Sequence, residues 1–217
     1  MVNHKSTQIL LLIGLLASVI TGIGEYMLHF LPVGPGGEVS MLNDVPLARA
    51  SKGHFISIIG APLYIAGYYG LKKLFETTSN NIAYLLFAFG TLAFFIGGIW
   101  ISSRYFGAEV LQRSQGTNNY EFFLASYESH YQVLVWALRV FVLAISVTYI
   151  TLILKNKIGL PKWLAISNPI LLLLFIFSTL VWFKPLGIHI APIAMNVAHF
   201  IFFGLILIAL RNTKHFN

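Results

Sequence analysis

Six apolar runs of roughly 20 residues each set the strongest constraint on how this chain can fold. A helix of that length crosses a hydrocarbon core of ~30 Å, because each residue adds 1.5 Å. The chain of 217 residues is 57% hydrophobic and 10% charged, whereas soluble domains are about 25% charged. We therefore predict an all-α polytopic membrane protein with six transmembrane helices in one bundle, forming a single domain over residues 1–217. The predicted spans are about 8–31, 53–74, 82–103, 131–154, 163–183 and 188–210.

The basic residues are distributed unevenly between the two ends of these runs. With the N-terminus inside, most of them fall on the cytoplasmic side, where Glu76 is the only acid, as the positive-inside rule favours. They are Lys5, Lys72, Lys73, Lys155, Lys157, Lys162, Arg211 and Lys214. We therefore predict that both termini are cytoplasmic. Since these residues lie at helix ends, the net charge of +7 indicates no nucleic-acid partner.

The first run follows a short basic segment, as the apolar core of a signal peptide does. It is longer than the ~7–15 residues of such a core, so we interpret it as a retained span. The chain contains no cysteine, which excludes disulfides, iron–sulfur clusters and thiolate catalysis.

Ionisable residues inside the predicted spans mark the candidate functional site, because charge in hydrocarbon is costly and usually faces a protein interior or a water-filled cavity. Residues three, four and seven apart share a helix face. The first span therefore places Ser18, Gly22, Glu25 and His29 on one stripe. We expect this stripe to face the bundle, where its small residues allow close helix packing.

The last span carries the longest polar line, formed by His189, Pro192, Asn196 and His199. In the second span, His54 and Tyr64 lie along a similar stripe, and Pro62 is expected to kink the helix.

The fourth span has two polar faces that point in nearly opposite directions. Glu128, Gln132 and Arg139 lie close together around the helix, whereas His130 points away from them. Because Arg139 is the deepest of the four and stays charged, we assign its face to the cavity. Glu25 is the only acid within a predicted span, so we predict an ion pair or a water-bridged pair between Glu25 and Arg139.

Two longer loops are predicted on the outer side, at about residues 32–52 and 104–130. The first begins with Pro32 and several glycines, which end a helix, and its second half from Asn43 to Lys52 is expected to form a short interfacial helix. The second contains a turn at 115–119 and a segment that continues into the next span. Together these loops are expected to form a lid.

A metal is one cofactor that fits the polar residues. His54, His199 and either Glu25 or His29 would be ligands for zinc or another divalent metal, whose bound water loses a proton near neutral pH. The alternative for these histidines is hydrogen bonding between helices. A second alternative is haem held by His54 and His199, which would make the protein an electron carrier.

The segments from Gly24 to Phe30, Gly53 to Phe55, Gly60 to Tyr64 and Gly67 to Tyr69 resemble a family of small bacterial membrane proteins of unknown function. This resemblance covers mainly the first two spans, brings no activity, and implies the bacterial inner membrane. The chain also loosely resembles the superfamily of membrane hydrolases that includes alkaline ceramidases. Those proteins hold zinc between seven helices and have a closing HxxxH, whereas this chain has six predicted spans and only Asn196-x-x-His199.

These observations lead to one expected function and two alternatives. We expect a metal-dependent hydrolase or lipid-modifying enzyme that opens to the outer leaflet and acts on a lipid or a small apolar or anionic substrate. Glu25, Arg139 and Asn196 would be catalytic, and the substrate-binding residues would be Tyr64, Arg104, Glu128, Gln132 and His189. The first alternative is a transporter or a lipid-binding protein that uses the same cavity, and the second is a structural subunit. No oligomeric state is indicated.

Overall fold

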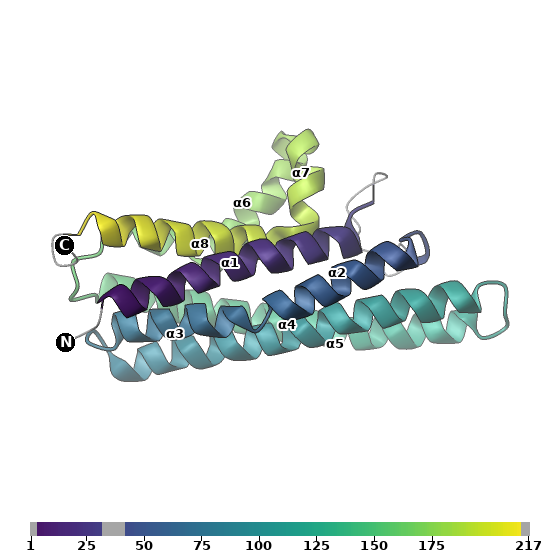
Figure 1. The fold of residues 1–217 in the computed structure, drawn as a ribbon, viewed down its shortest axis with the longest axis horizontal. Coiled ribbons are helices and arrows are strands. Elements are labelled where there is room, and N and C mark those ends of the chain that lie inside the picture. The colour runs from purple at the N-terminus through teal and green to yellow at the C-terminus, as the bar shows by residue number, and fades with distance from the viewer. Residues whose placement is uncertain (1–3, 32–41, 214–217) are drawn as a thin grey trace.

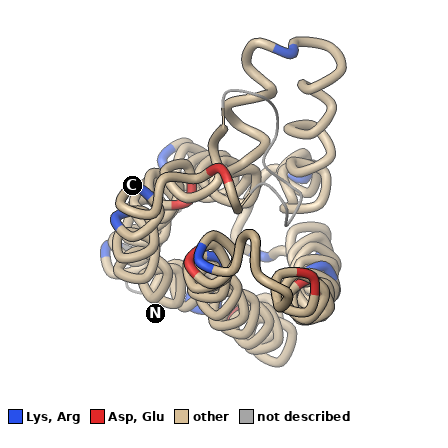
Figure 2. Tube along the Cα trace, turned by 90° about the vertical axis from the view of Figure 1, so that its right-hand side faces the viewer, with Lys and Arg blue, Asp and Glu red and all other residues tan. Residues whose placement is uncertain are grey.

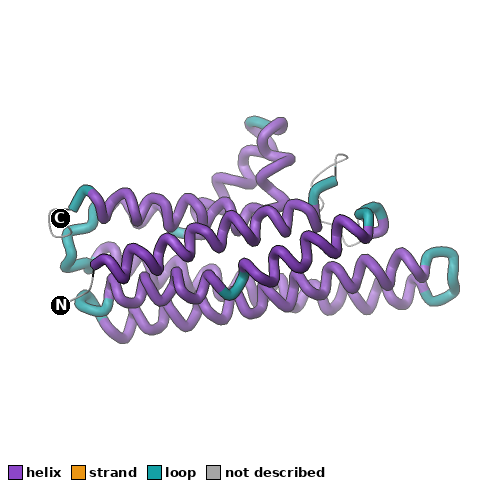
Figure 3. The backbone as a smooth tube through the Cα atoms, in the orientation of Figure 1, coloured by secondary structure: helices purple, strands orange, loops and turns teal. Residues whose placement is uncertain are grey.

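The computed structural model describes residues 4–31 and 42–213, and these residues form helices joined by turns, with no β-strand (Figures 1 and 3). The elements are α1 (His4–His29), α2 (Leu47–Gly60), α3 (Leu63–Phe75), α4 (Asn80–Ser114), α5 (Tyr120–Leu154), the 3₁₀ helix η2 (Lys162–Ser167), α6 (Pro169–Trp182), α7 (Lys184–Ile190), the 3₁₀ turn η3 (Ala191–Ile193) and α8 (Ala194–Arg211).

Most of the helices lie side by side along one long axis (Figure 1). α1 packs against α2, α3 and α8, and α4 packs against α3 and α5. The start of α1 and the end of α8 lie at the same end of the bundle, which we call the proximal end. The turn between α4 and α5 lies at the opposite, distal end.

Four helical segments of the described residues are long and apolar enough to cross a membrane: Lys5–His29, Asn80–Ser114, Tyr120–Leu154 and Lys184–Arg211. The second predicted span is divided into α2 and α3 at Ala61–Pro62. Proline lacks an amide hydrogen and clashes with the preceding turn, so the expected kink at Pro62 is confirmed. The fifth predicted span is reduced to α6, which has 14 residues and is therefore about 21 Å long.

The predicted loop at 104–130 is wrong over 104–114, which belongs to α4, whereas the predicted turn at 115–119 and the segment that continues into the next span are confirmed. α4 and α5 have 35 residues each and are separated only by residues 115–119. At about 52 Å, each is longer than a ~30 Å hydrocarbon core. The predicted third span ends at about residue 103, before the charged residues Arg104 and Glu109, whereas α4 continues past both to Ser114.

The first predicted loop lies partly outside the described residues, which exclude 32–41. In its second half, where a short interfacial helix was predicted, residues 47–52 are helical but form the start of α2, and residues 42–45 attach to the distal part of the bundle. The Gln112 side chain donates hydrogen bonds to the carbonyls of Leu42 and Val45, at 2.7 and 2.8 Å. Asn43 donates to the Tyr120 hydroxyl at 2.5 Å, and α2 begins at Leu47.

α6 and α7 form a hairpin that projects sideways from the bundle (Figures 1 and 2). α6 begins at Asn168, whose side chain accepts a hydrogen bond from the Leu171 amide, an N-cap that satisfies one free helix donor. The Ile170 amide is held by Ser146 of α5 at 3.1 Å. At the other end of the hairpin, Val181 and Trp182 are 81% and 84% exposed.

Glycines allow the closest approach of α1 to α2 and α3. A Cβ atom added to Gly14 or to Gly67 would lie 2.7 Å from the Cα atom of the other residue. Gly24 and Gly53 form a second contact of this kind between α1 and α2. Because lipid is as apolar as the helices, packing between small residues is a main source of helix association.

We expect Gly67→Ala to lower the free energy of unfolding by about 1–3 kcal/mol, because the methyl group would overlap the α1 backbone. Gly97→Ala is the matched control, since a Cβ atom there meets nothing within 4 Å. Thermal unfolding in detergent measures both. Equal effects of the two variants would contradict the packing described here.

Candidate functional site

Asn196 of α8 links three helices through its carboxamide. Nδ2 donates to Oε2 of Glu25 on α1 at 2.6 Å, and Oδ1 accepts from the Tyr64 hydroxyl on α3 at 2.8 Å. All three side chains are buried, with Asn196 only 2% exposed. A Cβ atom at Gly22 would lie 3.2 Å from the Asn196 side chain, so the small residue lets α1 approach this amide.

His199 lies one turn further along α8 and is completely buried. Its Nδ1 lies 2.8 Å from the Met195 carbonyl, and its Nε2 lies 2.8 Å from the Tyr68 hydroxyl. Because a carbonyl only accepts, Nδ1 carries a proton, and Nε2 of the neutral ring accepts from Tyr68. We call Glu25, Tyr64, Tyr68, Asn196 and His199 the polar centre.

A second group of buried polar side chains lies between α1 and the distal half of α4. Arg104 is 2% exposed and His29 is 3% exposed. The Arg104 guanidinium lies 5.4 Å from the Trp100 ring, and the His29 and Trp100 rings are 5.0 Å apart. The same guanidinium lies 5.6 Å from the ring of Tyr131 on α5 and hydrogen-bonds its side chain. We call His29, Trp100 and Arg104 the distal donor cluster.

The expected metal ligands do not meet. Within residues 4–31 and 42–213, no three His, Asp or Glu side chains are placed to hold a metal ion. His54 packs against Tyr105 and Phe106, both of α4, and its ring has no aromatic neighbour in common with that of His199 among the described residues. The metal site predicted from His54, His199 and either Glu25 or His29 therefore gains no support from the described residues.

The same geometry bears on the haem alternative. A haem ligand needs a free ring nitrogen, whereas both nitrogens of His199 are hydrogen-bonded within the protein.

The predicted pair between Glu25 and Arg139 is also wrong. Arg139 is exposed on the outside of α5, where its guanidinium lies 4.9 Å from the Trp136 ring. Among the described residues, ion pairs within 4.0 Å are Lys72–Glu76 and Arg113–Glu109. The cation whose electrostatic interaction reaches Glu25 is Arg104.

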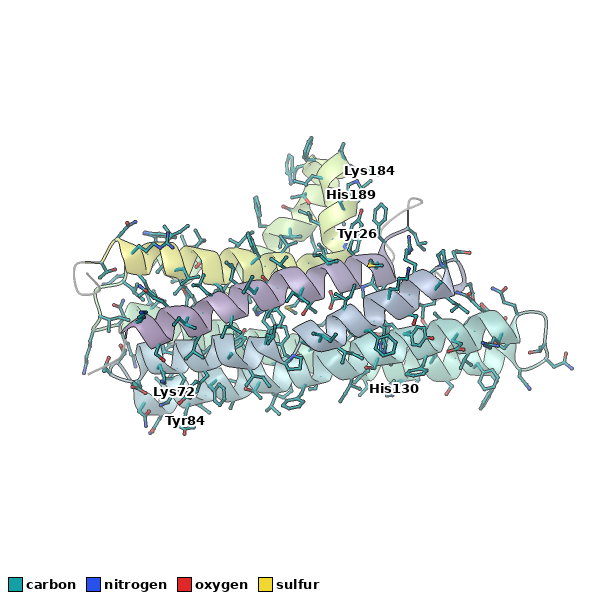
Figure 4. All side chains as sticks on the ribbon, viewed as in Figure 1. Tyr26, Lys72, Tyr84, His130, Lys184 and His189 are labelled. Carbon is teal, nitrogen blue, oxygen red and sulfur yellow. The ribbon has the colours of Figure 1, made fainter. Side chains whose placement is uncertain are left out.

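The other predicted residues of α5 also lie outside the bundle. Glu128 and Gln132 share the exposed face of Arg139. We expected this face to line the cavity, but it lies on the outside of the bundle. His130 is exposed too (Figure 4). It lines an open pocket of about 420 Å³ with Ser103 and Tyr127.

His189 lies at the base of the α6–α7 hairpin, close to the distal part of α1 (Figure 4). Its Nδ1 is 2.8 Å from the Tyr26 hydroxyl. The sequence predicted His189 as a substrate-binding residue. In the structure its side chain contacts Tyr26, which was not among the predicted site residues.

Trp100 and Tyr131 were also not among the predicted site residues. The spacing of Trp100 and Arg104, four residues apart on one helix, is the signal that indicates their contact.

A groove of about 360 Å³ runs between α1 and α8 beside the polar centre. Its walls are mostly apolar, and Asn196 is the member of the polar centre that lines it. We call it the α1–α8 groove, and its lining residues are Ser18, Val19, Gly22, Ile23, Tyr26, Met27, Ile193, Asn196, Val197 and Phe200. A larger groove of about 530 Å³ lies beside the α2–α3 break and includes Gly98, Ser102 and Ser103.

Comparison with known proteins gives one match. Residues 1–213 match a family described as a family of unknown function (DUF6796). The chain belongs to this family. The predicted membership in a family of unknown function is thus confirmed. Because the function of the family is unknown, the match assigns no activity to this chain. No curated protein and no solved structure matches the chain, so the likeness to alkaline ceramidases gains no support.

We expect Tyr64 and Asn196 to be coupled in a double-mutant cycle of Tyr64→Phe and Asn196→Ala. The coupling should be about 0.6–1.7 kcal/mol, as for other side-chain hydrogen bonds between membrane helices. Tyr149→Phe combined with Asn196→Ala is the control, because Tyr149 packs on Phe75 and Phe202 instead. Unfolding free energies in mixed micelles test this, and equal coupling in both cycles would contradict the hydrogen bond.

We expect Arg139→Gln to change the free energy of unfolding by less than about 1 kcal/mol, because the side chain is exposed and its contact with the Trp136 ring is a cation–π interaction at an exposed site. Its effect should add to that of Glu25→Gln. Denaturant unfolding of the two single variants and the double variant measures this. A non-additive result would restore the pair predicted from the sequence.

Proposed function

We propose that this protein binds a lipid or another amphipathic small molecule in the α1–α8 groove. The observation that carries this proposal is an apolar groove of about 360 Å³ with a buried, hydrogen-bonded asparagine in its wall. Ligand sites typically combine apolar walls with a few fixed polar groups. The metal-dependent hydrolase expected from the sequence gains no support, because no three His, Asp or Glu side chains among the described residues are placed to hold a metal ion.

The polar centre supports this proposal by fixing the Asn196 carboxamide. A carboxamide has two N–H donors and an oxygen with two lone pairs. Glu25 takes one donor and Tyr64 takes one lone pair, so one of each remains for a ligand. Since the amide cannot rotate without losing both bonds, it is preorganised, which lowers the cost of binding.

The apolar walls match the tail of such a molecule. Val19 and Ile23 on α1 are 41% and 53% exposed, and Phe200 on α8 is 48% exposed. In a bilayer these residues would contact acyl chains, so a lipid could enter the groove sideways without crossing water.

We propose a topology of six crossings in the inner membrane of a bacterium, with both termini cytoplasmic. α1 starts and α8 ends at the same end of the bundle (Figure 1), which fits an even number of crossings. η2 precedes α6 and would complete the fifth crossing, for which α6 alone is too short. The basic residues Lys72, Lys155 and Arg211 near the proximal end support a cytoplasmic location of that end.

We expect the purified wild-type protein to retain about one amphipathic molecule per chain, and Val19→Trp to lose most of it because the indole fills the groove. Gly98→Leu is the matched control, since it places a similar apolar side chain in the groove beside the α2–α3 break. Protein purified in mild detergent is extracted with organic solvent, and the bound molecules are quantified by mass spectrometry.

Retention of the same molecules by all three proteins, or of none by the wild type, would contradict binding in the α1–α8 groove. Asn196→Ala separates the roles of the two parts of the site. It should reduce retention by removing the polar contact while the apolar walls remain.

A further inference from the structure

The distal donor cluster contains a buried cation without an ion-pair partner. No acid in the described part of the chain lies within 4.0 Å of the Arg104 guanidinium, although the side chain is only 2% exposed. The electrostatic interaction of Arg104 does reach Glu25, whose Oε2 is already hydrogen-bonded to Asn196. A buried charge normally has a partner, because removing it from water is costly.

Three buried nitrogen atoms of this cluster also lack hydrogen-bond partners among the described residues. They are Nε of Arg104, Nε1 of Trp100 and Nε2 of His29. Arginine and tryptophan nitrogens only donate. The His29 Nδ1 lies 3.4 Å from the Pro192 carbonyl, which only accepts, so Nδ1 carries the proton and Nε2 is a buried acceptor. Arg104 and Trp100 therefore offer two unpaired donors from α4 to one ligand, and His29 faces them from α1.

The position of Arg104 along α4 indicates where this ligand would lie. Arg104 is 24 residues from Asn80, the first residue of α4, which is about 36 Å along the helix. A hydrocarbon core is ~30 Å thick. With the proximal end of α4 at one membrane surface, Arg104 lies at the headgroup level of the opposite surface, where lipid phosphates and soluble anions both occur.

We propose that the distal donor cluster binds a phosphate group, carried either by a phospholipid headgroup or by a free phosphate. The guanidinium supplies a charge-assisted hydrogen bond, and the indole N–H of Trp100, four residues earlier on α4, supplies a second donor. Tyr131 holds the guanidinium from α5. This site does not depend on the α1–α8 groove, because no residue of the cluster lines that groove.

Thermal unfolding of the full-length protein, purified in a phosphate-free detergent and stripped of lipid, tests this proposal. The two probes are inorganic phosphate and a short-chain phosphatidylglycerol, each compared with sodium chloride at equal ionic strength. A ligand that binds the folded state raises the midpoint of unfolding. A rise with phosphate identifies a free anion as ligand, and a rise with the lipid alone identifies a headgroup. No rise with either probe would overturn the proposal.

The variants separate this cluster from general electrostatic effects. Arg104→Gln should weaken binding by about tenfold or more, the usual effect of losing a charged hydrogen bond. Trp100→Phe, which keeps an aromatic ring but removes the N–H group, should weaken it several-fold. Glu25→Gln should strengthen it by removing the acid whose electrostatic interaction reaches Arg104.

Arg113→Gln is the matched control, because it removes a charge from the same helix at a side chain that is 73% exposed and paired with Glu109. Its midpoint shift should equal that of the wild type. If Arg104→Gln does not fold, Trp100→Phe and Glu25→Gln still test the site in opposite directions. Wild-type binding in both of these variants would overturn the proposal.

Discussion

The hydrogen bond between Glu25 and Asn196 ties the first long helix of the chain to the last one. A carboxyl group surrounded by hydrocarbon needs a partner from the protein, since lipid offers none and an unsatisfied polar group there costs several kcal/mol. Asn196 meets this need and passes the connection to Tyr64 on α3. One turn further along, the contact of Tyr68 with His199 joins α3 to α8 again. These bonds fix the relative positions of three helices that are far apart in sequence.

The glycine contacts of α1 make this arrangement possible. Gly14 and Gly24 bring the backbone of α1 close to α3 and α2, respectively, and Gly22 admits the Asn196 side chain. Close backbone contact gains dispersion energy, which takes over part of the role that the hydrophobic effect has in water. The polar bonds and the small residues therefore act together. The polar bonds set which helices meet, and the small residues set how closely these helices pack.

The sequence predicted the inward faces of α1 and α8 but not that of α5. On α1 and α8, glycine, glutamate, asparagine and histidine share one stripe in an otherwise apolar helix, so the polar face stands out. On α5, Arg139 and Glu128 also form a stripe, yet it faces outward, because a long cationic side chain can extend toward the interface from a lipid-exposed position. The predicted pair between Glu25 and Arg139 failed for this reason. Helical phase also says nothing about which helices are neighbours, so the separation of His54 from His199 was not predictable.

The sideways projection of the α6–α7 hairpin gives the molecule an uneven outline when viewed along the bundle (Figure 2). In a bilayer, lipids in the corner between the hairpin and the bundle touch protein on two sides, whereas lipids along α4 and α5 touch it on one. A lipid that leaves the corner loses more van der Waals contacts at once than a lipid that leaves the side formed by α4 and α5. The first lipid shell should therefore consist of two populations, with slow exchange in the corner and fast exchange along the smoother side.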